Sequence, residues 1–271
     1  MARHRPLRWI GITGFVVAGL LLAGYALIVV AFWLGQRSLL YPVPPPQSPA
    51  LEGGALVRVP IQGGGEAFAF YVPASPGGPT VAYFHGNGSQ VANRMPLASQ
   101  LREAGIGFFG VEYPGYGPAP GEPTESGIYE TSEAALKWLR AQGVANSQLI
   151  LFGRSLGSGV ATEMARRGYG SRTLLVSPYT SIADVAQHLY PFLPAQWLVT
   201  DRYDSLARAP ELRMPVLILH GTADTLIPFE IGERLARAFP SAVLVPVEGA
   251  GHDDILERPE VRTRILEFVR P

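Results

Sequence analysis

The sequence predicts an α/β fold with a mostly parallel central sheet, helices on both faces and a small cap, preceded by one N-terminal transmembrane helix. Three observations lead there: a long uncharged apolar segment at the N-terminus, a proline-rich stretch behind it, and a remainder in which short apolar runs alternate with helical patterns. Continuous apolar runs are typical of parallel strands buried on both faces, and strand–helix alternation is typical of right-handed crossovers.

The composition excludes several classes of protein. The 271 residues carry 22 basic and 22 acidic side chains, so no net positive charge recruits nucleic acid, and we expect no such partner. Cysteine is absent, which excludes disulfides, thiolate metal ligands and a cysteine nucleophile. No pair of histidines has the spacing of metal ligands, so we expect neither a metal nor a cofactor.

The N-terminal segment has the length and composition of a membrane anchor. Residues 9–36 contain no charged side chain and exceed the ~20 apolar residues that span a bilayer, with Trp9 and Trp33 near the two ends. The three arginines of residues 1–8 outnumber Arg37 on the other flank, which predicts a cytoplasmic N-terminus and a single-pass protein whose globular domain lies on the outer side. The alternative is a cleaved signal peptide, whose apolar region is shorter, about 7 to 15 residues.

A proline-rich linker over 37–50 should separate the anchor from a single catalytic domain over 51–271, because proline ends a helix and stiffens an extended chain. The domain opens with two alternating segments, 55–61 and 66–73, around a glycine-rich turn, which predicts an antiparallel hairpin. Six apolar runs follow and predict the parallel strands: TVAYFH, IGFFGVEY, QLILFG, TLLVS, PVLILHG and AVLVPVEG. Between them lie helical patterns such as 125–143, which stops at Gly143.

The stretch GRSLGSG places Ser155 where an apolar run gives way to a helix. In a parallel sheet reactive groups belong at the carboxyl ends of strands, and G-x-S-x-G at a strand-to-helix turn is the nucleophile elbow that exposes a serine hydroxyl. The alternative interpretation is that Ser155 only caps the following helix, since serine favours that position.

A serine nucleophile needs a base and a carboxylate that orients it, in the chain order Ser, Asp, His for this kind of sheet. His252, on a glycine-flanked loop after the last apolar run, is the expected base, and Asp224, after the PVLILHG strand, is the expected carboxylate. Asp224 could instead serve as a turn residue. His220 is more suited to ordering its own loop, and the acidic pair after His252 to capping the next helix.

Acyl transfer also needs backbone N–H donors for the developing oxyanion. The amide that follows the nucleophile is that of Leu156, and the HGNG turn after the first parallel strand offers the amide of Asn87. Glycine-rich turns are common after strands, so this motif carries weight only together with the others.

The segments HGNGS, VEYPGYG, GRSLGSG, HGTADTLIP and VEGAGHDDI together resemble the membrane-anchored serine hydrolases of the α/β-hydrolase domain family, in the bud-emergence-type branch that includes lysophospholipid lipases and protein depalmitoylases. The resemblance implies an α/β-hydrolase fold, a triad of Ser155, Asp224 and His252, and oxyanion donors at Asn87 and Leu156. Depalmitoylases of this branch attach through a cysteine-rich N-terminus, which this chain lacks, so their substrate cannot be carried over.

A small cap is expected over 177–206, which is rich in aromatic residues and proline. The expected substrate pocket comprises His85 of the HGNG motif and four cap residues: Tyr179, Tyr190, Phe192 and Trp197. These aromatic side chains could line an acyl pocket, dip into the bilayer surface, or simply pack over the sheet.

The sequence thus predicts a membrane-anchored serine hydrolase that cleaves carboxylic ester or thioester bonds of acyl lipids or acylated substrates through an acyl-enzyme. Two alternatives stay open: a serine peptidase on the same fold, and a membrane-tethered binding module without catalysis. The sequence gives no indication of the oligomeric state.

Overall fold

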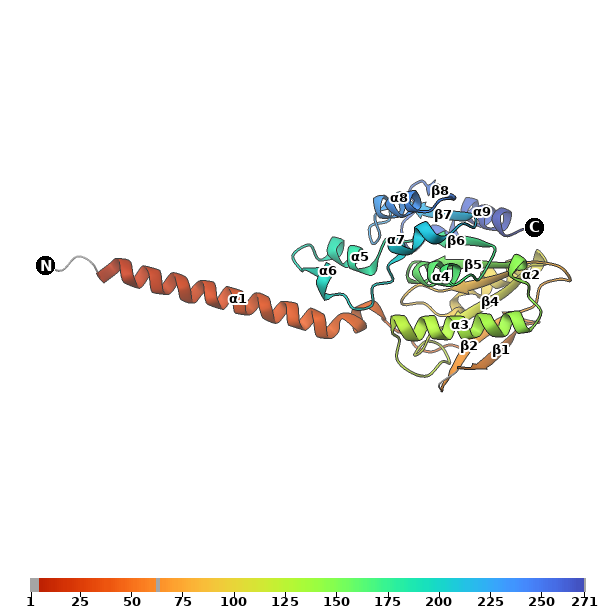
Figure 1. The fold of residues 1–271 in the computed structure, drawn as a ribbon, viewed down its shortest axis with the longest axis horizontal. Coiled ribbons are helices and arrows are strands. Elements are labelled where there is room, and N and C mark those ends of the chain that lie inside the picture. Colours follow the sequence, from red (N-terminus) through yellow and green to blue (C-terminus); the bar gives the residue numbers. More distant parts are fainter. Residues whose placement is uncertain (1–4, 62–63, 271) are drawn as a thin grey trace. The chain divides into compact units, whose positions relative to one another are not determined.

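The computed structural model describes residues 5–61 and 64–270, and of residues 5–13 the backbone only. Two compact units divide the chain, residues 1–40 and residues 41–271 (Figure 1). The first half of the predicted basic N-terminus, residues 1–4, lies outside the described residues.

The first unit consists of helix α1, Arg5–Leu40. In the part of the chain that the structure describes, one helical segment, Gly14–Leu40, is long and apolar enough to cross a membrane, with a mean hydropathy of 2.6. The helix continues four residues beyond the predicted end at 36, because three of them, Arg37, Leu39 and Leu40, are good helix formers. It ends before Tyr41, which precedes Pro42, and a residue before proline disfavours helical backbone.

The second unit is built on an eight-stranded sheet in the order β1-β2-β4-β3-β5-β6-β7-β8. The strands are β1 Ala55–Pro60, β2 Glu66–Val72, β3 Thr80–Phe84, β4 Gly107–Glu112, β5 Leu149–Arg154, β6 Arg172–Val176, β7 Val216–Gly221 and β8 Ala242–Val247. The opening hairpin β1–β2 is antiparallel, as predicted, and β2 is also antiparallel to β4. All pairings from β4 to β8 are parallel, so the carboxyl ends of these strands meet along one edge.

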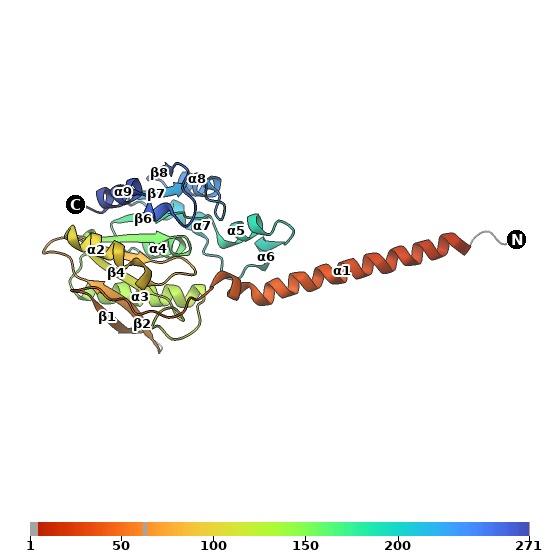
Figure 2. The same ribbon diagram turned by 180° about the vertical axis from the view of Figure 1, so that it is seen from behind.

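Helices cover both faces of the sheet (Figures 1 and 2). Helices α3 (Glu125–Ala141), α4 (Leu156–Arg166) and α8 (Phe229–Ala238) lie on one face. Helices α2 (Met95–Glu103) and α9 (Pro259–Val269) lie on the other, where they contribute to the main core cluster. This layering confirms the predicted α/β architecture.

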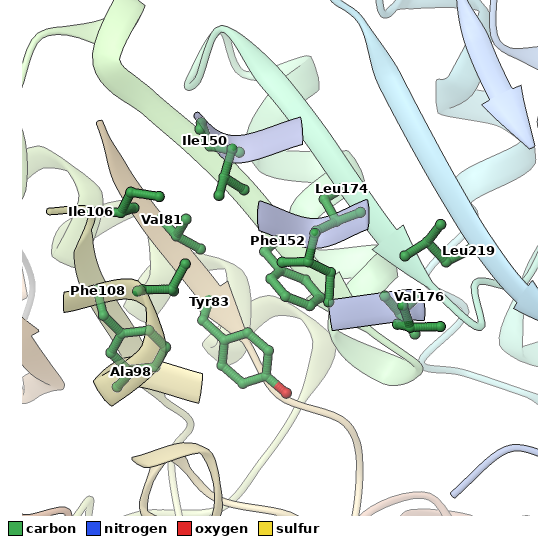
Figure 3. Close-up of a cluster of buried hydrophobic side chains, with 14 of the residues drawn as sticks. Val81, Tyr83, Ala98, Ile106, Phe108, Ile150, Phe152, Leu174, Val176 and Leu219 are labelled. Atoms are coloured by element: carbon green, nitrogen blue, oxygen red, sulfur yellow. The ribbon is translucent and has the colours of Figure 1, made fainter. Parts of the chain in front are cut away.

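The main core lies between the sheet and helices α2 and α9. Alternate residues of neighbouring strands point to this side, as Figure 3 shows for Tyr83, Phe152 and Val176, because side chains on a strand alternate between faces. Tyr83 and Phe152 pack edge to face with ring centroids 5.1 Å apart. The packed core fixes the strand ends from which the site is built.

Strand β8 departs from the expectation that every parallel strand is covered on both faces. It pairs with β7, and Val243 leaves 61% of its surface exposed. Pro246 lies within it, and proline lacks the N–H that a second neighbouring strand would need. The apolar run is therefore that of an edge strand.

The predicted linker is not a free spacer in this structure. Tyr41 is buried in the second unit, and its hydroxyl lies 2.9 Å from both Asp201 Oδ2 and the hydroxyl of Tyr203. Farther along the chain, the backbone N–H of Gln47 donates to Oε1 of Gln90, which follows the HGNG turn in sequence. Residues 41–50 thus belong to the globular unit.

The cap is formed after β6 by three short helices. They are α5 Ile182–Leu189, α6 Ala195–Leu198 and α7 Ser205–Arg208. In both views α5 and α6 project from the rest of the second unit, while α7 returns to lie against α4 (Figures 1 and 2).

Candidate active site

Ser155 occupies the turn between β5 and α4 in a strained backbone conformation, with φ 50° and ψ −122°. It stands at the N-cap position of α4, yet its side chain makes no capping hydrogen bond. The hydroxyl oxygen instead lies 3.0 Å from Nε2 of His252. Ser155 therefore does not cap α4 through its side chain, and its place at a strand-to-helix turn matches the geometry expected of a nucleophile elbow.

Two glycines let other backbone segments approach this turn. A Cβ at Gly157 would lie 2.0 Å from the carbonyl oxygen of Phe84, so only glycine allows the first turn of α4 to pack on the end of β3. A Cβ at Gly86 would lie 3.2 Å from Cβ of Ser155. The HGNG turn therefore passes directly beside the serine.

His252 connects the serine to Asp224. Its Nδ1 lies 2.8 Å from Oδ2 of Asp224, across 28 residues of chain. The other carboxylate oxygen, Oδ1, accepts the backbone N–H groups of Leu226 and Ile227. Because a carboxylate can only accept, Nδ1 carries the hydrogen, and in the neutral ring Nε2 is then free to accept the hydroxyl proton of Ser155.

The environment keeps the carboxyl group of Asp224 ionised. Burial by itself would raise its pKa, but the hydrogen bond to His252 and the charge of that ring, together with the Ile227 amide, outweigh burial and lower the pKa below the ordinary value of 3.8. The side chains of Asp224 and His252 are 0% and 9% exposed, so the pair is screened from water except at the imidazole.

The other candidates contact the pair differently: Nε2 of His220 lies 3.6 Å from Oδ2 of Asp224, beyond hydrogen-bond distance. His220 is buried, and its Nε2 lies 2.8 Å from the carbonyl oxygen of Ile227, which closes the loop that carries Asp224. Burial lowers the pKa of His220. Asp254 does not cap the next helix through its side chain but accepts the N–H of Gly251, while the side chain of Asp253 is exposed.

The side chain of His85 is fully buried and does not reach an open pocket. Its Nδ1 lies 2.9 Å from the carbonyl oxygen of Gly86, and its Nε2 lies 2.9 Å from Oε1 of Glu112 at the end of β4. The ring stacks on Tyr113 at 3.9 Å, and the Tyr113 hydroxyl donates to the His85 carbonyl. His85 thus holds the HGNG turn, and the expectation that it lines the substrate pocket does not fit a side chain without exposed surface.

Of the two predicted oxyanion donors, Leu156 directly follows Ser155, and Asn87 follows Gly86, which lies beside Ser155. Leu156 is the first residue of α4, where an amide has no acceptor within its own helix. The amide of Asn87 belongs to the same peptide unit as the Gly86 carbonyl, and in a trans peptide these two groups point in opposite directions. Because His85 binds that carbonyl, it also fixes the direction of the Asn87 N–H.

Sequence reasoning missed Arg154 and Glu112. Arg154 lies beside the serine, is 6% exposed, and its Nη2 donates to the carbonyl oxygen of His252 at 2.9 Å and to Oδ1 of Asp253 at 3.3 Å. Arg154 therefore ties the loop of His252 to the elbow. A charged side chain inside an otherwise apolar strand end is the signal that could have identified each of them.

The predicted aromatic pocket residues do not gather in one place. Tyr179 is buried, and its hydroxyl donates to the Leu156 carbonyl under α4. Tyr190 is half-buried, with its ring 6.4 Å from that of Phe192. Phe192 and Trp197 lie on the outside of the cap, 56% and 89% exposed.

The chain is similar in sequence to proteins from distant organisms. A family model described as TAP-like protein matches residues 192–270. The uncharacterized protein Rv2307c of Mycobacterium tuberculosis is 34% identical over 264 residues, which cover 94% of this chain and 90% of that protein. The alpha/beta hydrolase domain-containing protein 17C of Xenopus tropicalis is 32% identical over 206 residues, 73% of this chain and 64% of that protein.

Solved structures share the fold at lower identity. A monoacylglycerol lipase of Paleococcus ferrophilus matches with a TM-score of 0.60 and 22% identity, over 75% of this chain and 98% of that one. The Pyrococcus furiosus esterase Pf2001 matches with a TM-score of 0.68 and 18% identity, over 84% and 98%. The fold predicted from sequence is thereby confirmed as that of an α/β hydrolase. With 34% identity over nearly its whole length, the chain belongs to the same family as Rv2307c.

Proposed function

We propose that this protein is a membrane-anchored serine hydrolase that cleaves carboxylic ester or thioester bonds of acyl lipids or acylated substrates. One observation carries the proposal: the continuous chain of contacts from Ser155 through His252 to Asp224, at 3.0 and 2.8 Å. These distances lie within the range expected of a nucleophile, its base and the group that orients the base.

In the proposed reaction Ser155 Oγ attacks the carbonyl carbon of the substrate while its proton passes to Nε2 of His252. A C–O bond forms and the carbonyl electrons move to the oxygen, giving a tetrahedral oxyanion. When this collapses, the bond to the alcohol or thiol breaks, and the leaving group takes the proton from His252. Water then repeats the sequence on the acyl-enzyme, releasing the acid and restoring the serine hydroxyl.

The backbone N–H groups of Asn87 and Leu156 would bind the oxyanion. The proximity of Gly86 to Ser155 and the start of α4 at Leu156 support this assignment. Two such donors are the usual number in this chemistry, and loss of one typically lowers kcat about 10²- to 10³-fold. The negative charge on Asp224 would stabilise the imidazolium that forms at the same moment.

The membrane placement is part of the proposal. Helix α1 has the length and hydropathy of a single span, and the arginines before it favour a cytoplasmic N-terminus with the hydrolase unit outside. A reporter fused to the C-terminus that functions only outside the cytoplasm should be active. Activity of a reporter restricted to the cytoplasm would contradict this orientation.

The decisive experiment is hydrolysis of p-nitrophenyl esters from short to long acyl chains by the full chain in detergent, beside the Ser155→Ala variant. We expect turnover that falls by about 10⁴-fold or more in the variant, because the attacking atom is gone. Ser158→Ala is the matched control: this buried serine lies one turn along α4, and its loss should leave turnover unchanged.

Other outcomes point elsewhere. Turnover that survives Ser155→Ala would contradict the triad. Cleavage of peptide amides without any cleavage of esters would favour a serine peptidase. Failure of the wild type both to hydrolyse esters and to react with a serine-directed phosphonate would favour a binding module.

A further inference from the structure

The outside of the cap carries a cluster of exposed apolar side chains, which we call the cap patch: Leu189, Phe192 and Trp197, exposed by 40%, 56% and 89%. They lie on α5, on α6 and on the turn between them, in the part that projects from the second unit (Figures 1 and 2). Burying one such side chain is worth roughly 1.5 to 3 kcal/mol, so leaving three of them in water is unfavourable.

The cap patch differs from the other exposed apolar side chains of the second unit. Val43, Leu56, Leu226 and Val243 are single residues on separate strands and loops, which is ordinary for a protein surface. The patch instead lies within residues 185–199, a stretch without any aspartate, glutamate, lysine or arginine. Asp184, just before it, is paired with Arg234, so covering the patch would desolvate few charges.

The structure also shows where the apolar helix joins the second unit. Tyr41 is bonded to Leu40, the last residue of α1, so their Cα atoms are about 3.8 Å apart in any orientation of the helix. The Tyr41 hydroxyl is buried against Asp201 and Tyr203, both in the cap segment. The anchor is therefore attached to the hydrolase unit at the cap.

We infer that the cap patch rests on the lipid surface of the membrane that α1 spans. Attachment at the cap brings this part of the unit to the bilayer, and tryptophan and phenylalanine are the side chains that favour the boundary between acyl chains and headgroups. The inference rests on the proposed anchor but not on the proposed catalysis. The substrate would then reach the cap from the bilayer and not from solution.

The absence of cysteine makes a direct test possible, because one introduced cysteine is the only site for a thiol-reactive probe. The full chain is placed in lipid nanodiscs as Trp197→Cys labelled with the fluorophore NBD. Quenching is compared between lipids with a nitroxide near the headgroup and a quencher dissolved in water. Val243→Cys, on the edge strand β8 and 61% exposed, is the matched control, and Phe192→Cys repeats the test within the patch.

We expect the probes at 197 and 192 to be quenched several times more strongly by nitroxide lipids than the probe at 243, and several times less by the aqueous quencher. Equal quenching at 197 and 243 by either route overturns the inference. Protection of position 197 from the aqueous quencher without quenching by lipid would overturn it too, and would indicate a second protein copy on the patch. None of these readouts requires turnover, so a failed hydrolase assay would leave the result intact.

Discussion

At the scale of single residues, two buried side chains each determine the hydrogen-bonding state of a neighbouring group in the site. Asp224 determines which nitrogen of His252 carries hydrogen, and His85 determines the direction of the Gly86–Asn87 peptide. The proximity of Ser155, Asp224 and His252 could be predicted from sequence because each follows an apolar run at a strand end. Glu112 stands out in sequence as a charge at an apolar strand end, but its partner could not be predicted, because nothing local to β4 indicates that a histidine 27 positions earlier will meet it.

Replacing Asp224 with asparagine should lower kcat by about 10⁴-fold, because an amide can donate to Nδ1 and so favours the tautomer that cannot accept from Ser155. Steady-state kinetics on a short ester would measure this. A loss of less than about tenfold would contradict the orienting role of Asp224.

Asp224 should also contribute to acid stability. Because the pKa of Asp224 is lower in the folded protein than its ordinary value of 3.8, its ionised form favours folding above that pH, and the contribution disappears as pH falls through the folded pKa. Asp224→Asn should therefore lose less stability than the wild type between neutral pH and pH values below 3.8. Denaturant titrations at both conditions measure the difference, and parallel losses would contradict it.

Glu112→Leu should lower kcat by up to about 10²-fold with little change in KM, since His85 would lose the partner that holds its ring and the oxyanion donor would be misdirected. Glu112→Gln keeps a polar group beside Nε2 and should restore most of the activity. A merely structural role would instead lower the amount of folded protein in both variants without separating kcat from KM. Circular dichroism and full kinetics on both variants distinguish these cases.

At the scale of elements, the carboxyl ends of β3, β5, β7 and β8 carry the residues of the predicted triad and oxyanion donors, and the end of β4 adds Glu112. Hydrophobic runs predict these strands because burial on both faces leaves a continuous apolar signature. The contacts between elements leave no such trace: Arg154 reaches the loop after β8 across 98 residues, and Tyr41 reaches the cap across 160. Periodicity reports the environment of a segment and not the identity of its neighbours.

Arg154→Met should lower kcat about tenfold or more while leaving the fold intact. The side chain of Arg154 makes two hydrogen bonds that hold the loop of His252, and a hydrogen bond from a charged donor is worth about 1.5 to 3 kcal/mol. The exposed Arg264→Met, which removes an ion pair to Glu267 on α9, is the control and should behave as wild type. Equal activity of both variants would show that the elbow does not position the His252 loop.

At the scale of the whole molecule, the segment after α1 is part of the hydrolase unit. Tyr41 contributes a hydroxyl to a buried cluster with Asp201 and Tyr203. Burial, together with the nearby charge of Asp201, raises the pKa of Tyr41, which favours the protonated hydroxyl that donates to Asp201. A proline-rich stretch has the composition of a spacer, and nothing in the sequence indicates that one tyrosine at its start fixes the stretch to the cap.

Tyr41→Phe should therefore lower the free energy of unfolding by about 1 to 3 kcal/mol, because it leaves the buried Asp201 with one donor fewer. Limited proteolysis should cut faster within 177–206 than in the wild type. Tyr71→Phe, a half-buried position on β2, is the comparison and should change neither quantity appreciably. Unchanged proteolysis of the cap in Tyr41→Phe would contradict the role of this contact.

Because the backbone at Ser155 is strained, selection for stability and selection for catalysis favour different residues at this position. Among the residues that the structure describes, Ser155, Ser177 and Tyr203 are the ones other than glycine with positive φ, and such conformations cost of order 1 to 3 kcal/mol each. Glycine at position 155 would relieve that strain and abolish the nucleophile at once. A library selected only for thermal resistance would therefore drift away from serine there, whereas one selected for turnover would keep it and tolerate a less stable domain.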